Sequence, residues 1–300
     1  MTLHSFPTVE LSGLFVALPT PFTGDQVVDF SAFRRLARRA LAGGASGLVA
    51  LGPTGEASSL EEVERDVILQ TALEEADGRP VLAGTGSCST RQTIAWTRRA
   101  QQLGARAALV VTPFYNLPTQ GGLVAHYQAI AQAVPGFPLL IHNVPARTGV
   151  NLESVTLRSL WRIPEVAGVL ESSGNLEQIE RMIQALPRGK VLLAGDDELA
   201  ATSIALGARG LVGSLGSAFP EWAADLVRAA LAGRSEEAAR LQEQLRPLIQ
   251  ALLFETDPVP LKALLKRLGL CGDQVRLPLL AASPGTRAVL SDALRRSQVA

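Results

Sequence analysis

Short apolar runs rich in valine, leucine and alanine recur along the chain, and each is closed by a glycine, a proline or a polar residue. Eight such runs occur, at residues 13–22, 47–52, 81–86, 107–113, 139–143, 166–172, 191–197 and 210–214. Their apolar residues are nearly continuous instead of alternating with polar ones, which is typical of strands buried on both faces. The pattern therefore predicts parallel strands in a sheet that is covered by helices.

Segments with helical spacing separate the apolar runs. Ser59 precedes the segment LEEVERDVILQTAL, where Glu62 is placed as a capping-box partner, and Ser89 precedes TRQTIAWTRRAQQL, which ends at Gly104. Because the alternation of strand and helix stops after the eighth run, we predict an α/β fold, a closed (β/α)8 TIM barrel. An open doubly wound sheet fits the same alternation, but no GxGxxG follows the first run, so a dinucleotide-binding version has little support.

The pattern becomes purely helical after about residue 218. Three amphipathic segments follow, EWAADLVRAALAG, SEEAARLQEQLRPLIQALLF and PVPLKALLKRLG, and then a final helix near 284–295. No linker rich in proline, glycine or serine marks a boundary. We expect residues 1–217 to form the barrel core and residues 218–300 to form the last barrel helix and a C-terminal helical extension, packed together as one structural unit.

Composition and charge exclude several classes of function. The formal net charge is zero, and no basic run offers a surface to nucleic acid or to a membrane, so we expect neither partner. The N-terminus has no basic region before its apolar run, and no apolar stretch approaches the roughly 20 residues of a membrane span, which predicts a cytoplasmic protein. Cys88 and Cys271 form no metal-binding pattern, and we expect two buried free thiols.

Candidate chemistry lies where the strands of such a barrel end, in the loops that follow them. Arg147 supplies a fixed cation, the loop 52–56 (GPTGE) supplies backbone N–H groups, and Tyr115 and His142 supply a hydroxyl and an imidazole. This set predicts a pocket for a small anion such as a keto acid. A purely structural interpretation remains open, in which Arg147 pairs with a neighbouring carboxylate and His142 is a core histidine with its hydrogen bonds satisfied.

Several segments together carry a family resemblance: GPTGEASSLEEVER, GTGSCST, VVTPFYNLPTQGGLVAHY, HNVPARTG, GVLESSGNL, LLAGDDELA and ETDPVPLK. In order and spacing they resemble the dihydrodipicolinate synthase and N-acetylneuraminate lyase family, over nearly the whole chain. The resemblance implies a (β/α)8 barrel with a C-terminal helical extension, usually a homotetramer. It also implies a class I aldolase or lyase that uses pyruvate or a related 2-keto acid, without a cofactor.

The resemblance fails at the residue on which that chemistry depends. In the family, a lysine in a GxKExxG pattern on the sixth strand condenses with the keto group to form an imine. Here that place is Leu170, which has no nucleophile. The other lysines are poor substitutes: Lys190 precedes the seventh strand and lies roughly 17–20 Å from the C-terminal face, while Lys262 and Lys266 are expected on a solvated face of the extension.

Two further positions depart from the family. Pro53 stands where the family usually has a hydroxyl of the proton relay, and His142 stands where it has a tyrosine that positions the keto group. Tyr115 matches a residue that reaches across a subunit interface in the synthases, which implies a homo-oligomer, dimer or tetramer. We expect no certain catalytic residue, no metal, and a substrate-binding set of Pro53, Thr54, Tyr115, His142, Arg147 and Val212.

Three functions compete. The first is a non-catalytic or diverged member that binds a small carboxylate or 2-keto acid. The second is a lyase or aldolase that replaces the imine with acid–base groups or a metal, using His142, Glu171, Asp196 and Asp197; with one histidine in the region and no HxH or HxxE spacing, the metal version has little support. The third, an ordinary synthase or lyase, conflicts with the loss of the nucleophile.

Overall fold

The computed structural model describes residues 11–297. Residues 1–10 and 298–300 lie outside this range. They include the start of the predicted barrel core, the end of the predicted C-terminal extension, and the first part of the N-terminal segment on which the cytoplasmic prediction rests. Among the described helices, none is long and apolar enough to cross a membrane.

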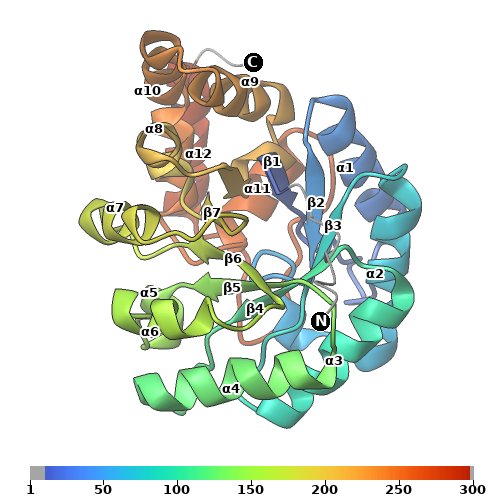
Figure 1. The fold of residues 1–300 in the computed structure, drawn as a ribbon. Helices are drawn as coiled ribbons and strands as arrows, with labels where there is room; N and C mark the ends of the chain where they lie inside the picture. The colour runs from blue at the N-terminus through green and yellow to red at the C-terminus, as the bar shows by residue number, and fades with distance from the viewer. Residues whose placement is uncertain (1–10, 298–300) are drawn as a thin grey trace.

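Eight parallel strands close into a barrel, which confirms the TIM-barrel prediction over the open sheet (Figure 1). Each strand pairs with its neighbours in chain order, and β8 returns to pair with β1. Each strand lies within one of the eight apolar runs, and every strand except β5 ends before its run does. They are β1 (Gly13–Ala17), β2 (Gly47–Ala50), β3 (Val81–Gly84), β4 (Ala107–Val111), β5 (Leu139–Asn143), β6 (Val166–Glu171), β7 (Val191–Ala194) and β8 (Gly210–Gly213).

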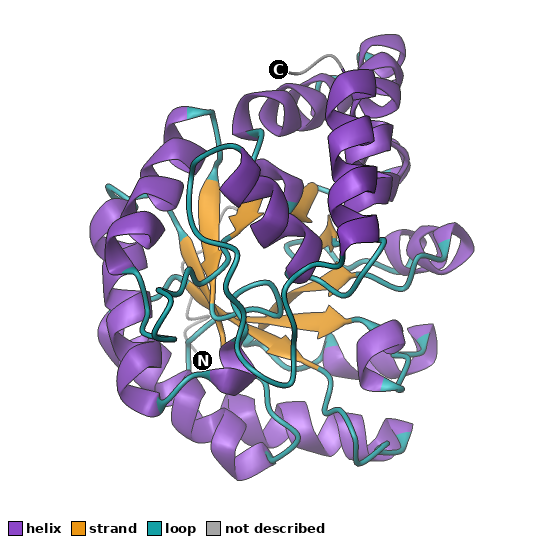
Figure 2. Ribbon diagram, turned by 180° about the vertical axis from the view of Figure 1, so that it is seen from behind, coloured by secondary structure: helices purple, strands orange, loops and turns teal. Residues whose placement is uncertain are grey.

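Helices surround the strands on the outside of the barrel (Figure 2). They are α1 (Phe30–Ala42), α2 (Glu62–Glu75), α3 (Thr90–Leu103), α4 (Gln120–Ala133), α5 (Pro145–Thr148), α6 (Ser154–Leu160), α7 (Leu176–Gln184), α8 (Ala200–Leu206) and α9 (Pro220–Leu231). Short 3-10 turns, η1 (Ala57–Ser59), η2 (Asp197–Leu199) and η3 (Leu215–Ser217), follow β2, β7 and β8. The C-terminal extension consists of α10 (Ser235–Leu252), α11 (Val259–Arg267) and α12 (Pro284–Ser297), and α10 packs against α8, α9 and α12.

The apolar strand residues build two separate cores. Successive side chains of a strand point to opposite faces, so alternate residues fill the barrel interior while the others pack beneath the helices. The interior core consists of Leu11, Phe15, Val49, Leu82, Ala107, Leu109, Leu140, Leu170, Leu193 and Val212. Leu170 is therefore a core residue of the barrel interior, and it lies beside His142 in the register of β5 and β6.

The two predicted helix caps have different outcomes. At α3 the Ser89 side chain accepts a hydrogen bond from the backbone N–H of Gln92, and Gly104 ends the helix with a left-handed φ of 99°, as expected. At α2 the prediction is wrong, because Glu61 and Glu64 form the capping box in place of Ser59 and Glu62.

Ser59 cannot cap α2 because it belongs to the short turn η1. Its hydroxyl donates to the carbonyl oxygen of Glu56, and Ser59 itself lies two residues before Glu61, the N-cap of α2. The Ser59 hydroxyl is thus used within the turn that follows β2, and the side chain of Glu61 caps α2 in its place.

Two expectations about burial are also wrong. Cys88 is exposed and Cys271 is partly buried, because both lie in loops and not on apolar strand or helix faces. Lys262, expected on a solvated face, is fully buried on α11.

Candidate functional site

Two adjoining cavities open at the C-terminal end of the barrel, where the site was predicted. The first, here called the barrel cavity, has a volume of about 360 Å³ and rests on inward-facing side chains of the strands. The second, the side cavity, also has a volume of about 360 Å³ and lies over β2 to β5, beneath residues 276–279. The two cavities share Gly52, Pro53, Leu109, His142, Val144, Arg147 and Asp257.

Most of the residues selected from the sequence meet in the barrel cavity, which is lined by Pro53, Thr54, His142, Arg147, Leu170 and Val212. Tyr115 lines neither cavity, and 89% of its surface is exposed in the loop after β4, where its φ of 67° is left-handed. Its predicted contact with a ligand depends on a second subunit and stays a prediction.

The floor of the barrel cavity offers no amine. Leu170 is 2% exposed and pairs in register with His142 on one side and Leu193 on the other. Lys190 lies at the opposite end of the barrel, as predicted, since its ammonium donates to the carbonyl oxygens of Pro164 (3.1 Å) and Val166 (2.5 Å) at the start of β6. Within residues 11–297, no lysine lines either cavity.

His142 is buried and electrically neutral. Burial, reinforced by the charge of Arg147, lowers the pKa of its imidazole to about 4. Its Nε2 lies 3.2 Å from the Oγ atom of Ser172, which also lines the barrel cavity. The residue thus combines the two interpretations left open by the sequence: it has a hydrogen-bond partner, and it faces the cavity.

Arg147 and Thr54 converge on one carboxylate, Asp257. The Thr54 hydroxyl donates to Asp257 Oδ2 over 2.9 Å. The guanidinium of Arg147 donates from Nη2 to the Asp257 carbonyl oxygen (3.3 Å) and lies 3.7 Å from Oδ2. Asp257 was not selected from the sequence, where its segment ETDPVPLK served only the resemblance; the local pattern carries no sign that it reaches the barrel mouth.

The GPTGE loop does not offer all of its backbone amides to a ligand. The N–H of Gly55 donates to the carbonyl oxygen of Gly52 (3.1 Å), and that of Glu56 donates to Pro53 (3.0 Å). For these two groups the predicted anion-binding role is wrong, because the turn uses them internally.

Acidic side chains outnumber basic ones around the barrel cavity. The aspartates Asp196 and Asp197 line it, and burial raises the pKa of both, that of Asp197 to about 6. Glu171 lines neither cavity; its carboxylate accepts hydrogen bonds from the side chain of Asn143 and the backbone N–H of Ser173. No group of three or more histidine, cysteine, aspartate and glutamate residues is arranged for a metal ion within the described part of the chain.

The family model of the dihydrodipicolinate synthetase family matches residues 10–297. The chain belongs to this family. A curated relative from Thermomicrobium roseum, named 4-hydroxy-tetrahydrodipicolinate synthase, is 46% identical over 285 residues, covering 95% of this chain and 94% of the relative.

Solved structures of the family superpose closely. The dihydrodipicolinate synthase from Acinetobacter baumannii, solved in complex with pyruvate, has a TM-score of 0.94 and 36% identity, covering 96% of this chain and 99% of the other. The enzyme from Cyanidioschyzon merolae, solved with lysine bound, has a TM-score of 0.92 and 32% identity over 96% of this chain and 99% of the other.

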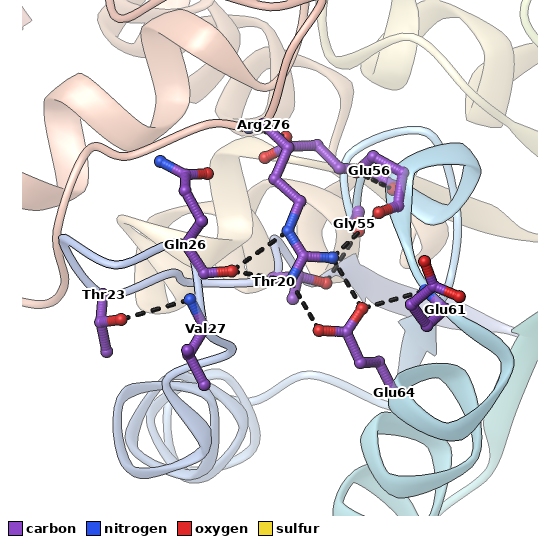
Figure 3. A network of polar contacts seen from close by, with 10 residues as sticks. Thr20, Thr23, Gln26, Val27, Gly55, Glu56, Glu61, Glu64 and Arg276 are labelled. Atoms are coloured by element: carbon purple, nitrogen blue, oxygen red, sulfur yellow. Dashed lines mark hydrogen bonds and ion pairs between the residues drawn. The ribbon is translucent and has the colours of Figure 1, made fainter.

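A buried ion pair holds the GPTGE loop of this family member in place. The ammonium of Lys262 donates to Glu56 Oε1 (2.5 Å) and to the carbonyl oxygen of Gln274 (2.8 Å). Glu56, which has a left-handed φ of 51°, also accepts from the backbone N–H of Arg276 (3.0 Å). The Arg276 guanidinium continues the network to Glu64 (Figure 3). No local sequence pattern indicates this network, since Glu56 and Glu64 contact Lys262 and Arg276 across more than 200 positions.

Proposed function

We propose that this chain binds a small carboxylate, such as pyruvate or another 2-keto acid, in the barrel cavity and does not form the imine intermediate of class I aldolases. The observation that carries the proposal is Leu170. By resemblance it occupies the place of the imine-forming lysine on the sixth strand, and it is packed in the apolar floor of the cavity.

The carboxylate half of the site is supported by Arg147 and Thr54. A guanidinium and a hydroxyl at a barrel mouth are the donors that carboxylate recognition requires. A relative of the same fold was solved in complex with pyruvate, which supports a ligand of this class for this chain.

The loss of imine chemistry follows from the nucleophile. Condensation with a ketone requires an unprotonated amine within bonding distance of the carbonyl carbon. The ammonium groups of Lys190 and Lys262 are engaged with backbone carbonyls and with Glu56, and neither lysine lines the barrel cavity. Pro53 has no hydroxyl with which to relay a proton, so the neighbouring chemistry is altered as well.

A second candidate function is a lyase that uses acid–base groups in place of the imine. The observation that favours it is the pair of titratable groups in one cavity: neutral His142 and Asp197, whose pKa is raised to about 6. A group with a pKa near the working pH is suited to move protons in either direction.

The decisive experiment is borohydride reduction in the presence of pyruvate, followed by intact-mass measurement and peptide mapping. We expect no adduct on this chain, while the Thermomicrobium roseum synthase, treated in parallel, serves as the test of the trapping conditions. A pyruvate adduct on any of the three lysines would overturn the proposal. Calorimetry with pyruvate tests the binding half separately: heat of binding supports it, and its absence across 2-keto acids and sugar acids removes it.

We also propose that the chain forms a homo-oligomer in which Tyr115 contacts a second copy. Its exposed ring and left-handed backbone support this arrangement, because a large aromatic side chain presented to solvent on a loop is suited to an interface. Light scattering of the wild type and of Tyr115→Ala measures the mass directly. A monomeric wild type at micromolar concentration contradicts the proposal.

A further inference from the structure

Asp257 occupies the donors on which recognition of a ligand carboxylate depends. Its Oδ2 atom accepts the Thr54 hydroxyl (2.9 Å), and Arg147 Nη2 lies 3.7 Å from the same oxygen. The side chains of Arg147 and Asp257 are 40% and 24% exposed, and both residues line both cavities. An incoming carboxylate therefore meets a cation that already has an anion beside it.

The other charges around the barrel cavity also oppose the binding of an anion. Within the described residues, Arg147 is the one basic side chain of the lining, against the carboxylates of Asp196, Asp197, Glu198 and Asp257. Like charges brought close together in a partly desolvated site cannot all remain ionised without cost. A ligand that adds a further carboxylate makes protonation of one of these groups favourable.

We propose that a small carboxylate binds in the barrel cavity together with one proton, which Asp257 takes up. Protonation removes the anion beside Arg147 and frees the guanidinium for the ligand, while an oxygen of the carboxyl group still accepts the Thr54 hydrogen bond. Asp257 thereby sets, at a given pH, how strongly this site prefers a carboxylate over a ligand without one. The inference rests on the proposed carboxylate-binding function.

The surroundings of Asp257 are suited to such a change. Burial raises the pKa of its carboxyl group, and the charge of Arg147 and the hydrogen bond from Thr54 lower it. Glu56, from the loop after β2, raises this pKa further, and Lys262, from α11, lowers it. The negative charge of a bound ligand raises the pKa of Asp257 further and so increases its proton affinity in the complex.

Asp196 and Asp197 also have a raised pKa and compete for the proton, and the larger shift is that of Asp197. Asp197, in the loop after β7, has a pKa of about 6, whereas His142 on β5 has a pKa of about 4 and stays neutral above mildly acidic pH. Asp197 differs from Asp257 in its partners, since its Oδ2 atom accepts the backbone N–H of Ser214 (3.1 Å) and not a cation of the binding set. Separate variants of the two aspartates distinguish them.

The test is calorimetry of pyruvate binding at about pH 5.5, 6.5 and 7.5, in buffers of different ionisation enthalpy. We expect the wild type to take up one proton per pyruvate and to lose affinity by up to about tenfold per pH unit as the pH rises. In Asp257→Asn an amide oxygen still accepts from Thr54 and the backbone carbonyl still accepts from Arg147. This variant is expected to bind pyruvate more tightly than the wild type at neutral pH, without proton uptake.

Two matched variants complete the design. Glu198→Gln removes one negative charge from the same cavity, and Asp197→Asn removes the stronger of the competing acids; both are expected to keep the proton uptake. Uptake that persists in Asp257→Asn, or that disappears in Asp197→Asn, overturns the inference. Wild-type binding without proton uptake also overturns it but leaves the proposed function standing, whereas failure of both wild type and Asp257→Asn to bind pyruvate overturns both.

Discussion

The buried ion pair of Lys262 and Glu56 provides a quantitative test of how the barrel mouth is held together. The two side chains are 0% and 3% exposed, and the Lys262 ammonium also lies 4.2 Å from the centre of the Phe22 ring. Replacing Lys262 by Met leaves the Glu56 carboxylate buried without its cation. Breaking a buried pair in this way costs about 3–5 kcal/mol.

The assay is urea unfolding followed by tryptophan fluorescence and circular dichroism in parallel, because coincident transitions justify a two-state free energy. We expect Lys262→Met to lose about 3–5 kcal/mol. The double variant with Glu56→Gln should recover part of that loss, since the orphaned charge is gone. As a control, Arg228→Ala breaks an exposed pair with Asp225, whose side chains are 63% and 53% exposed, and is expected to cost about 0–1 kcal/mol.

A loss below about 1 kcal/mol in Lys262→Met would refute the reasoning, because it would mean that water reaches Glu56 as readily as it reaches a surface carboxylate. A double variant less stable than Lys262→Met alone would refute it equally, since the orphaned charge would then not be the source of the cost.

Three further outcomes are expected. Leu170→Lys should trap a pyruvate adduct with borohydride and lose about 4 kcal/mol of stability, from an amine pKa lowered by about 3 units in the apolar interior; a folded variant without adduct would show that no keto acid reaches this position. Arg276 lowers the pKa of Glu64 through a hydrogen bond, so its stabilisation is present above the unfolded-state pKa of about 4.3 and is lost as pH falls through the lower folded value. The free energy of unfolding of Glu64→Gln, measured from pH 7 downward, should therefore fall below that of the wild type at neutral pH and converge with it in acid; a gap independent of pH would contradict this assignment. Ser89→Ala should cost about 1 kcal/mol in urea unfolding and Ser89→Asp should restore it, because either side chain can cap α3, and equal losses in both variants would remove the capping explanation.

Local pattern was sufficient for the strands of the barrel. The run 139–143 became β5 (Leu139–Asn143) without change, because five buried residues bounded by a proline and a loop have few other places in an α/β protein. The helices after residue 218 could be predicted for a similar reason, because the amphipathic spacing of a helix does not depend on which element it packs against. The position of Leu170 on the sixth strand was also readable, because strand periodicity fixes which side chains face the interior.

The arrangement of polar side chains at the barrel mouth was less accessible. Arg147 and His142 could be selected, because the rule that sites lie at the C-terminal ends of strands depends only on the order of elements. Their partners could not be named: Arg147 contacts a residue 110 positions further along the chain, and Thr54 contacts the same residue across 203 positions. No local pattern specifies contacts of that separation.

The sequence by itself determined the eight strands and the leucine at position 170, since each depends on residue type and periodicity along a short segment, whereas the pairing of β8 with β1 that closes the barrel is a long-range contact. Only the tertiary structure decided that Lys262 is buried against Glu56 and that Asp257 stands beside Arg147. The physical reason is that a charge on a helix is solvated or buried according to what the rest of the chain places opposite it, and here the extension lies against the loops at the barrel mouth.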